Sequence, residues 1–225
     1  MLRRFPPALA GLLALLALGA GSASAMQVER VPERGWRVRL AAELGVSWRQ
    51  VNLPRFRLRQ PDRLSALPRE RLPAGPDLEL ALAPSRCSLL ELDVGPPADR
   101  GRPDAWRRAT RCLKLAHCAP GASDADRRRA TAMATAKTGS RIEIRPLVNP
   151  LLVQPGSDLP VRLYYEGEAV VGAAVEATGP GDARAAAVSD RVGIAVLTLP
   201  APGLWRLSFA ARGGRAELIF DVEKR

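Results

Sequence analysis

The residues with the greatest chemical potential are three cysteines, Cys87, Cys112 and Cys118, and the single histidine, His117. Thiolate sulfur and imidazole nitrogen are ligands that soft transition metals prefer, so the four side chains could together form one metal site. The Cys-x-x-Cys pair common in zinc sites is missing from the sequence. His117 could also activate the neighbouring thiol of Cys118, although residues adjacent in sequence need not face each other. These four residues are the candidates for a metal site or a reactive thiol.

The same cysteines could instead form a disulfide, with one of the three left over. A helix over residues 104–117 that ran on through Cys118 would place Cys112 and Cys118 roughly 9 Å apart along its axis. That separation exceeds the limit of about 7 Å between the Cα atoms of a bridged pair. A bond between Cys112 and Cys118, our leading pair, therefore requires the helix to end near Ala116. The alternatives are a bond that joins Cys87 to one of the two, or no disulfide.

Other catalytic and ligand-binding patterns are missing from the sequence. One histidine allows one imidazole base, and no serine lies in a Gly-x-Ser-x-Gly turn. The glycine-rich loops that bind nucleotide phosphates do not occur either. Asp158 and Asp190 lie outside any dense acidic loop, so we interpret them as turn residues rather than calcium ligands. We therefore expect no enzymatic activity and no bound cofactor.

The composition is strongly basic, with a formal net charge of +11 over 225 residues, and only three of the 34 basic residues are lysines. Such a surface is either a solvated exterior or a docking face for an acidic partner, such as a phosphate-bearing glycolipid or an anionic lipid. Aromatic residues make up only 4% of the chain and do not alternate with arginines in a base-stacking pattern. We therefore expect no nucleic-acid partner.

The N-terminal residues 1–25 have the pattern of a secretory signal peptide. Arg3 and Arg4 form a positive segment, Leu9 to Leu18 is an apolar stretch, and Ala23-Ser24-Ala25 is a small-residue cleavage site. The apolar stretch is shorter than the roughly 20 residues that cross a bilayer as a helix, and no later segment is apolar enough. The sequence predicts a periplasmic or secreted protein that is not transmembrane after processing.

Residues 26–122 are expected to form a β-rich region that a single helix closes. Apolar and charged residues alternate around Trp36, Phe56 and Leu78, and prolines interrupt the stretch too often for a long helix. Asp104 is a good N-cap for a helix over 104–117, whose polar side would carry Arg107, Arg108, Arg111 and Lys114. This basic face, together with Tyr164 from a later strand, is the candidate partner surface.

Residues 123–140 are interpreted as a mobile or marginally helical linker, with a weak capping box at Ser123 to Asp126. Residues 141–225 are expected to form a β-sandwich, because seven short apolar-alternating strands are separated by turns. Glu166-Gly167 and Gly213-Gly214 are its predicted hairpin turns. Tyr164 and Tyr165 would lie on opposite faces of one strand, so that only one of them is expected in the core. The overall fold class is therefore mostly β.

A resemblance to a known family covers roughly residues 89–222, and it is carried by turns and core positions. The chain resembles a family of secreted bacterial domains of unknown function, which is related to the periplasmic accessory component of nickel and cobalt uptake systems. The matching segments are Ile142 to Pro150, Pro155-Gly156, Leu159 to Leu163, Gly172 to Val175 and Pro202 to Trp205. The resemblance implies an immunoglobulin-like or transthyretin-like C-terminal sandwich and a role near transition-metal uptake.

These observations lead to one functional hypothesis and one alternative. The first is a non-enzymatic accessory or binding protein of the cell envelope, associated through the resemblance with nickel or cobalt uptake. Met26 to Glu29 stand where members of that family carry histidine, so the hypothesis involves an envelope or membrane-protein partner rather than direct metal coordination. The alternative is a structural or adhesive envelope domain that docks an acidic partner through its arginine-rich surface.

Overall fold

The structure is a computed structural model that describes seven segments of the chain. The signal segment expected over residues 1–25 lies outside them, as do Arg107 and Arg108. The described residues are 26–31, 35–40, 48–49, 52–66, 72–80, 87–95 and 110–223.

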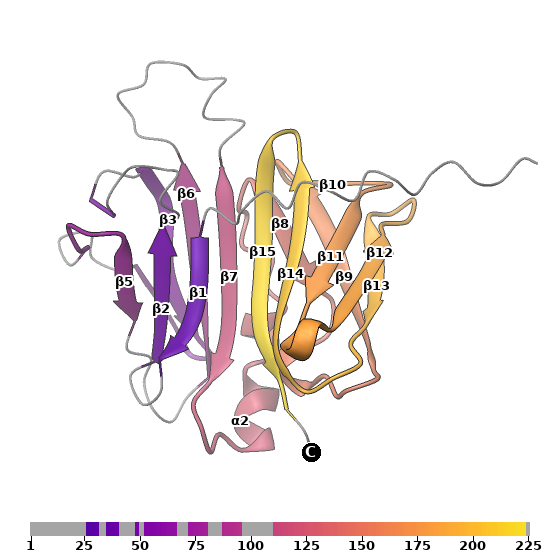
Figure 1. The fold of residues 1–225 in the computed structure, drawn as a ribbon, viewed down its shortest axis with the longest axis horizontal. Coiled ribbons are helices and arrows are strands. Elements are labelled where there is room, and N and C mark those ends of the chain that lie inside the picture. The colour runs from indigo at the N-terminus through magenta and orange to yellow at the C-terminus, as the bar shows by residue number, and fades with distance from the viewer. Residues whose placement is uncertain are drawn as a thin grey trace, which may run out of the picture.

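One long mixed sheet runs through the molecule and contains strands from both halves of the sequence (Figure 1). In spatial order it consists of β12 (Arg184–Val188), β11 (Ala174–Thr178), β14 (Gly203–Ala211), β15 (Gly214–Val222), β7 (Arg111–Cys118), β6 (Cys87–Gly95), β3 (Asn52–Gln60) and β4 (Arg63–Ala66). The last strand of the chain, β15, pairs in parallel with β7. The expected regions 26–122 and 141–225 are thus joined by backbone hydrogen bonds in one sheet.

Two smaller sheets lie against this long sheet near its opposite ends (Figure 1). The first consists of β1 (Met26–Val31), β2 (Gly35–Leu40) and β5 (Asp77–Leu80). The second consists of β8 (Ile142–Pro146), β9 (Asp158–Tyr165), β10 (Glu168–Ala169) and β13 (Ile194–Thr198). The prediction of a mostly β fold is confirmed, and nearly every strand expected from sequence alternation is present.

The central strands of the long sheet are buried on both faces, and successive residues of each strand face different cores. In β7, Leu113 and Leu115 belong to one hydrophobic core and Ala116 to the other. In β15, Ile219 belongs to the first of these cores and Phe220 to the second. The two small sheets therefore cover opposite faces of the long sheet, and the shared strands build two cores at once.

The N-terminal core lies between the β1-β2-β5 sheet and strands β3, β6 and β7. Trp36 and Val38 of β2 pack there with Leu90 and Leu92 of β6, and all four side chains are essentially inaccessible to solvent. The C-terminal core lies between the second small sheet and strands β14 and β15. A Cβ atom on Gly179 would lie 2.6 Å from the Trp205 ring, so this close approach requires glycine.

The helix predicted over 104–117 is wrong where the structure describes it, because residues 111–118 form strand β7. Burial on both faces explains the error. A strand in the middle of a sheet carries apolar residues on each side, and such a short apolar run also fits helical spacing. Residues 104–109 lie outside the described part of the chain.

Residues 123–140, expected to be a linker, contain two short helices, α2 (Asp124–Arg129) and α3 (Thr131–Ala134). The capping box is confirmed, since Ser123 and Asp126 exchange side-chain and backbone hydrogen bonds. Met133 and Ala134 are buried in the C-terminal core, so this segment is part of the packed structure. Short 3-10 turns occupy Pro150–Leu152 and Pro180–Asp182. Among the described residues, no helix is long and apolar enough to span a membrane.

The two predicted hairpin turns differ in outcome. Glu166 and Gly167 have positive φ angles of 52° and 87° and connect β9 to β10, as expected. The later turn lies one residue earlier than predicted, at Arg212-Gly213, because Ala211 pairs directly with Gly214. Arg212 and Gly213 have φ angles of 48° and 82°, the signs that a type I′ turn needs to match the twist of its strands.

Candidate functional site

A disulfide joins Cys87 to Cys118, so the predicted bond between Cys112 and Cys118 is wrong and the alternative that used Cys87 is confirmed. The two half-cystines are directly opposite in the register of β6 and β7, with their Cα atoms 3.9 Å apart. Cys112 remains a buried free thiol. Because β7 is a strand, Cys112 and Cys118 are separated by six residues of extended chain, roughly 20 Å.

The thiol of Cys112 is held in its protonated form. The side chain is only 4% exposed and lies opposite Asp93 on the neighbouring strand β6. Burial, reinforced by the negative charge of Asp93, raises the pKa of Cys112 well above its usual value. A thiol with such a pKa is a poor nucleophile and a poor metal ligand at neutral pH.

His117 faces away from all three cysteines, toward the N-terminal core. Its ring packs edge-on against Trp36, with 5.2 Å between ring centroids. Burial, together with the positive charges of Arg30 and Arg127, lowers the pKa of His117 to about 4. The imidazole is therefore neutral at physiological pH and belongs to the packing.

The four metal-ligand candidates are thus not brought together. Cys87 and Cys118 are used in the disulfide, Cys112 lies well along the strand, and His117 points to the other face. Within the described residues, no group of three or more His, Cys, Asp or Glu side chains is arranged to hold a metal ion.

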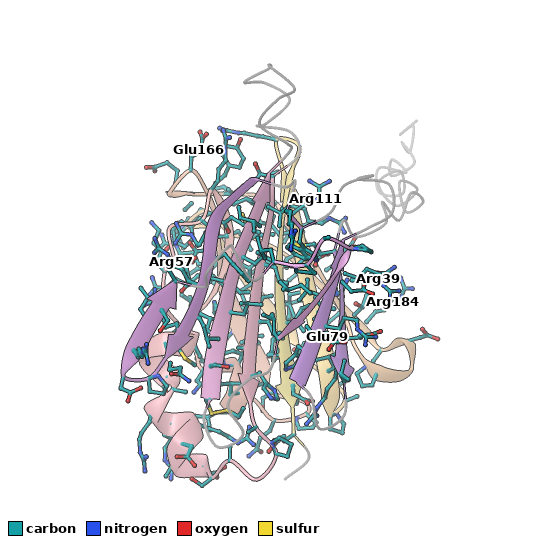
Figure 2. All side chains as sticks on the ribbon, turned by 90° about the vertical axis from the view of Figure 1, so that its left-hand side faces the viewer. Arg39, Arg57, Glu79, Arg111, Glu166 and Arg184 are labelled. Atoms are coloured by element: carbon teal, nitrogen blue, oxygen red, sulfur yellow. A yellow bond between two sulfur atoms is a disulfide. The ribbon has the colours of Figure 1, made fainter. Side chains whose placement is uncertain are left out.

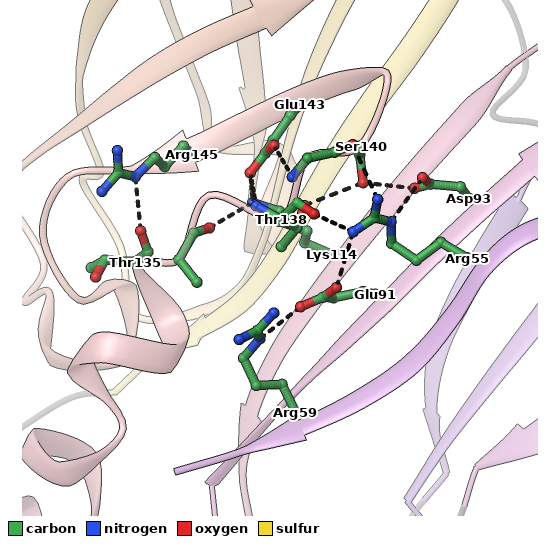
Figure 3. Close-up of polar contacts among 12 residues, drawn as sticks. Arg55, Arg59, Glu91, Asp93, Lys114, Thr135, Thr138, Ser140, Glu143 and Arg145 are labelled. Atoms are coloured by element: carbon green, nitrogen blue, oxygen red, sulfur yellow. Dashed lines mark hydrogen bonds and ion pairs between the residues drawn. The ribbon is translucent and has the colours of Figure 1, made fainter. Parts of the chain in front are cut away.

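A buried charge cluster lies where the N-terminal strands meet the chain that enters β8 (Figure 3). Lys114 of β7 donates to Glu143 Oε1 of β8 over 2.5 Å and to the carbonyl of Ala136 over 3.2 Å. Glu143 also accepts the backbone N–H groups of Thr138 and Gly139. The charged members of the buried charge cluster are Arg55, Arg59, Glu91, Asp93, Lys114 and Glu143.

The second half of the buried charge cluster ties β3 to β6. Arg55 donates to Asp93 over 3.2 Å and to the carbonyl of Gly139 over 3.1 Å. Asp93 also accepts the hydroxyl of Ser140 over 2.8 Å. Arg59 donates to Glu91 over 2.8 Å. Three acids and three bases are therefore interleaved, and they fasten residues 136–143 onto the N-terminal strands.

Burial sets the electrostatics of the buried charge cluster. It raises the pKa of Asp93, while hydrogen bonds from Ser140, Cys112 and Arg55 oppose this shift. Burial lowers the pKa of Lys114, and Glu143 opposes that shift. Each charge is stabilised mainly by its partners, as in structural ion-pair networks. The arrangement can hold two parts of the fold together.

The candidate partner surface is not assembled as predicted. Lys114 is 4% exposed inside the buried charge cluster, so its assignment to a solvated face is wrong. Tyr164 is 6% exposed and covered by Lys137, whose Nζ lies 4.2 Å from the ring centroid. Tyr165 is buried as well, because its side chain belongs to the C-terminal core. Arg111 is half-buried.

Many other arginines are used in ion pairs within the molecule. Arg37 contacts Glu29 over 2.6 Å and Glu79 over 2.8 Å. Arg39 contacts Asp77 over 2.5 Å, and Arg39 and Glu79 both lie on the outer side of the β1-β2-β5 sheet (Figure 2). Part of the arginine excess is therefore paired with carboxylates on the surface of this sheet.

Sequence reasoning missed the buried charge cluster, although a signal was present. The β6 run Leu-Leu-Glu-Leu-Asp-Val places Glu91 and Asp93 at alternate positions of an apolar strand. Lys114 occupies the same kind of position in β7. Charges on one face of a strand that is otherwise apolar indicate buried ion pairs when partner strands carry the opposite charge at matching positions.

Comparison with known proteins identifies the family. Residues 20–213 match the model of the family described as Domain of unknown function (DUF4198), and the chain belongs to that family. No curated protein matches the chain at the significance required.

Proposed function

We propose that this protein is an exported, non-catalytic binding module of the cell envelope. One observation supports this proposal most directly. The side chains with chemical potential have structural roles: Cys87 and Cys118 in a disulfide, Cys112 beside Asp93, and His117 against Trp36. A protein with its reactive groups used in this way acts through its surface.

The disulfide supports the proposed location outside the cytoplasm. Structural disulfides form and persist in oxidising compartments and are rare where thioredoxin and glutathione keep thiols reduced. A bond between two central strands, together with the signal pattern of residues 1–25, favours the periplasm or the exterior.

The association with nickel or cobalt uptake stays a prediction from the resemblance. If it holds, the protein contributes by contacting a component of the uptake system, since Cys87, Cys112, His117 and Cys118 do not converge. The arginine-surface alternative receives less support, because Lys114 is buried and Arg37 and Arg39 are paired with carboxylates.

In-cell crosslinking with a matched variant tests the proposal. The wild-type protein is expected in the periplasmic or secreted fraction, and a photo-crosslinker at exposed Leu64 should give a defined adduct with an envelope component. A Cys112→Ala/His117→Phe variant with a normal circular dichroism spectrum should give the same adduct. Loss of the adduct in that folded variant would contradict the proposal, as would a cytoplasmic location. An adduct that disappears at high salt would favour the arginine-surface alternative.

A further inference from the structure

Strand β13 is an edge of the second small sheet, because β9 is its only hydrogen-bonded neighbour among the described strands. Two hydrogen bonds, one at each end of β13, determine which of its residues bond to β9 and which face the open side. Leu163 N–H donates to Gly193 O over 2.9 Å, and Leu199 N–H donates to Ser157 O over 3.3 Å. Hydrogen-bonded positions recur at every second residue of an antiparallel ladder. The odd-numbered residues of β13 therefore bond to β9, and the even-numbered residues direct their backbone groups to the open edge.

Two of these even-numbered residues offer unpaired backbone groups. Ile194 is satisfied by Asp190, whose carboxylate accepts its N–H and whose N–H donates to its carbonyl. The backbone N–H and C=O groups of Val196 and Thr198 have no hydrogen-bond partner among the described residues. Pro160, the residue of β9 opposite Val196, supports this assignment. It has no N–H group, and its carbonyl accepts from Leu147 N–H on the side of β9 away from β13. The open edge thus presents two N–H groups and two C=O groups.

The strand lacks the usual protection of an edge. Natural sheets discourage pairing with another chain by charged residues or proline on their edge strands. Arg63, Glu79 and Arg184 place charges on the edge strands β4, β5 and β12. The sequence of β13 is Ile-Ala-Val-Leu-Thr, with no charge and no proline. Val196 is 51% exposed at its centre.

Three further exposed valines lie near the start of β13, in or next to the loops that meet there. Val171 is 59% exposed, Val188 64% and Val192 43%. The loops that carry them are joined by a hydrogen bond from Gly172 N–H to Ser189 O over 2.9 Å. With Val196, they are four of the seven large hydrophobic side chains that are exposed in the described part of the chain. Exposed apolar side chains next to an open edge are typical of a surface that pairs with another strand.

We propose that β13 pairs antiparallel with β13 of a second copy of this chain, about a two-fold axis at Leu197. In this register Val196 of each copy exchanges both backbone hydrogen bonds with Thr198 of the other, which satisfies all the free groups of the edge. A second copy is the occupant that the free backbone groups favour, because each copy presents two N–H and two C=O groups that match those of the other. The strand itself carries no charge that would repel its counterpart. This inference does not depend on the proposed function.

Sedimentation equilibrium combined with amide hydrogen exchange tests the pairing on the full chain without residues 1–25. The wild-type protein should form dimers, and the amides of Val196 and Thr198 should become protected as the protein concentration rises. The amides of Ala195 and Leu197, which bond to β9, should be protected at every concentration. A wild-type protein that stays monomeric at its highest soluble concentration would overturn the inference. A dimer with unprotected Val196 and Thr198 amides would do so as well.

Matched variants identify the edge. Val196→Lys places an ammonium group at the centre of the pair and should raise the dimer dissociation constant at least roughly tenfold, through like-charge repulsion and lost apolar contact. Leu64→Lys is the control, because Leu64 is 48% exposed on another edge strand, β4. This strand lies at the end of the long sheet opposite β12, the strand that precedes β13. This control should dimerise like the wild type. Equal dimerisation by both variants, with unchanged melting temperatures, would contradict the proposal.

Discussion

At the scale of single residues, the side chains that could do chemistry are held by packing and charge. His117 is the clearest case, since its ring lies against Trp36 in a core built from two sheets. Its low pKa results first from burial and then from the nearby positive charges of Arg30 and Arg127. The neutral imidazole is therefore a packing residue whose protonation opposes folding.

His117 predicts a specific pH dependence of stability. Its pKa in the folded protein is about 4, below the usual value of 6.5. The unfolded chain therefore binds a proton at a higher pH than the folded protein does. The contribution of the neutral ring to the free energy of unfolding is fully present above pH 6.5 and is lost as the pH falls to 4. The loss amounts to about 3 kcal/mol. Urea unfolding from pH 7 to pH 4 should show this decline in the wild type in excess of that in His117→Phe. An equal decline of the free energy of unfolding in both proteins would contradict the role given to His117.

Lys114 and Glu143 predict a coupled response to substitution. Lys114→Met leaves the buried Glu143 carboxylate without its ammonium partner and should lower the free energy of unfolding by about 3–5 kcal/mol. The double variant Lys114→Met/Glu143→Gln removes both charges and should recover a large part of that loss. Urea unfolding of the three proteins checks the prediction. A double variant less stable than the single one would show that the pair is not coupled in this way.

At the scale of elements, the central strands β6 and β7 take part in both cores and carry the disulfide. The sequence pattern predicted most strands, because one buried face gives a clean alternation, as in β2 and β14. It failed at β7, where two buried faces remove the alternation and leave an apolar run that also fits a helix. A helix that ended near Ala116 would have let Cys112 and Cys118 approach each other, whereas strand β7 holds them apart, and so the predicted disulfide pair was wrong.

The Cys87–Cys118 bond is expected to stabilise the protein by restricting the unfolded chain. It closes a loop with a sequence separation of 31, for which the chain-entropy relation gives roughly 3–4 kcal/mol. A Cys87→Ala/Cys118→Ala variant should lose about this much and become insensitive to reductant. Cys112→Ala is the control and should keep the response of the wild type to reductant. A wild-type protein equally stable with and without reductant would contradict the prediction.

At the scale of the whole molecule, one sheet makes the two halves interdependent. The C-terminal core includes Leu89 of β6 and Ala116 of β7, which precede the expected sandwich boundary at residue 141. The division into regions follows from composition and turns, but composition cannot reveal the parallel pairing of β15 with β7, because that pairing joins residues about a hundred positions apart. In the buried charge cluster, the alternation of β6 and β7 marks the buried charges, but it does not identify their partners, because the ion pairs join strands that are separated in the sequence.

Shared strands predict that the C-terminal region does not fold by itself. A fragment of residues 141–225 lacks β7, which hydrogen-bonds to β15 and covers part of its core. This fragment should show no cooperative thermal transition, whereas the full chain should unfold in one transition that far- and near-ultraviolet circular dichroism follow together. A fragment that melts cooperatively at the temperature of the full chain would show that the halves are independent.

The scaffold role of the cysteines and of β7 can be tested most directly by disulfide mapping. Protein isolated from the envelope fraction with its thiols trapped would be digested without reduction and examined by mass spectrometry. We expect a peptide pair linked through Cys87 and Cys118, with Cys112 recovered as the trapped free thiol. A link between Cys112 and Cys118, or three free thiols in the exported protein, would contradict this expectation.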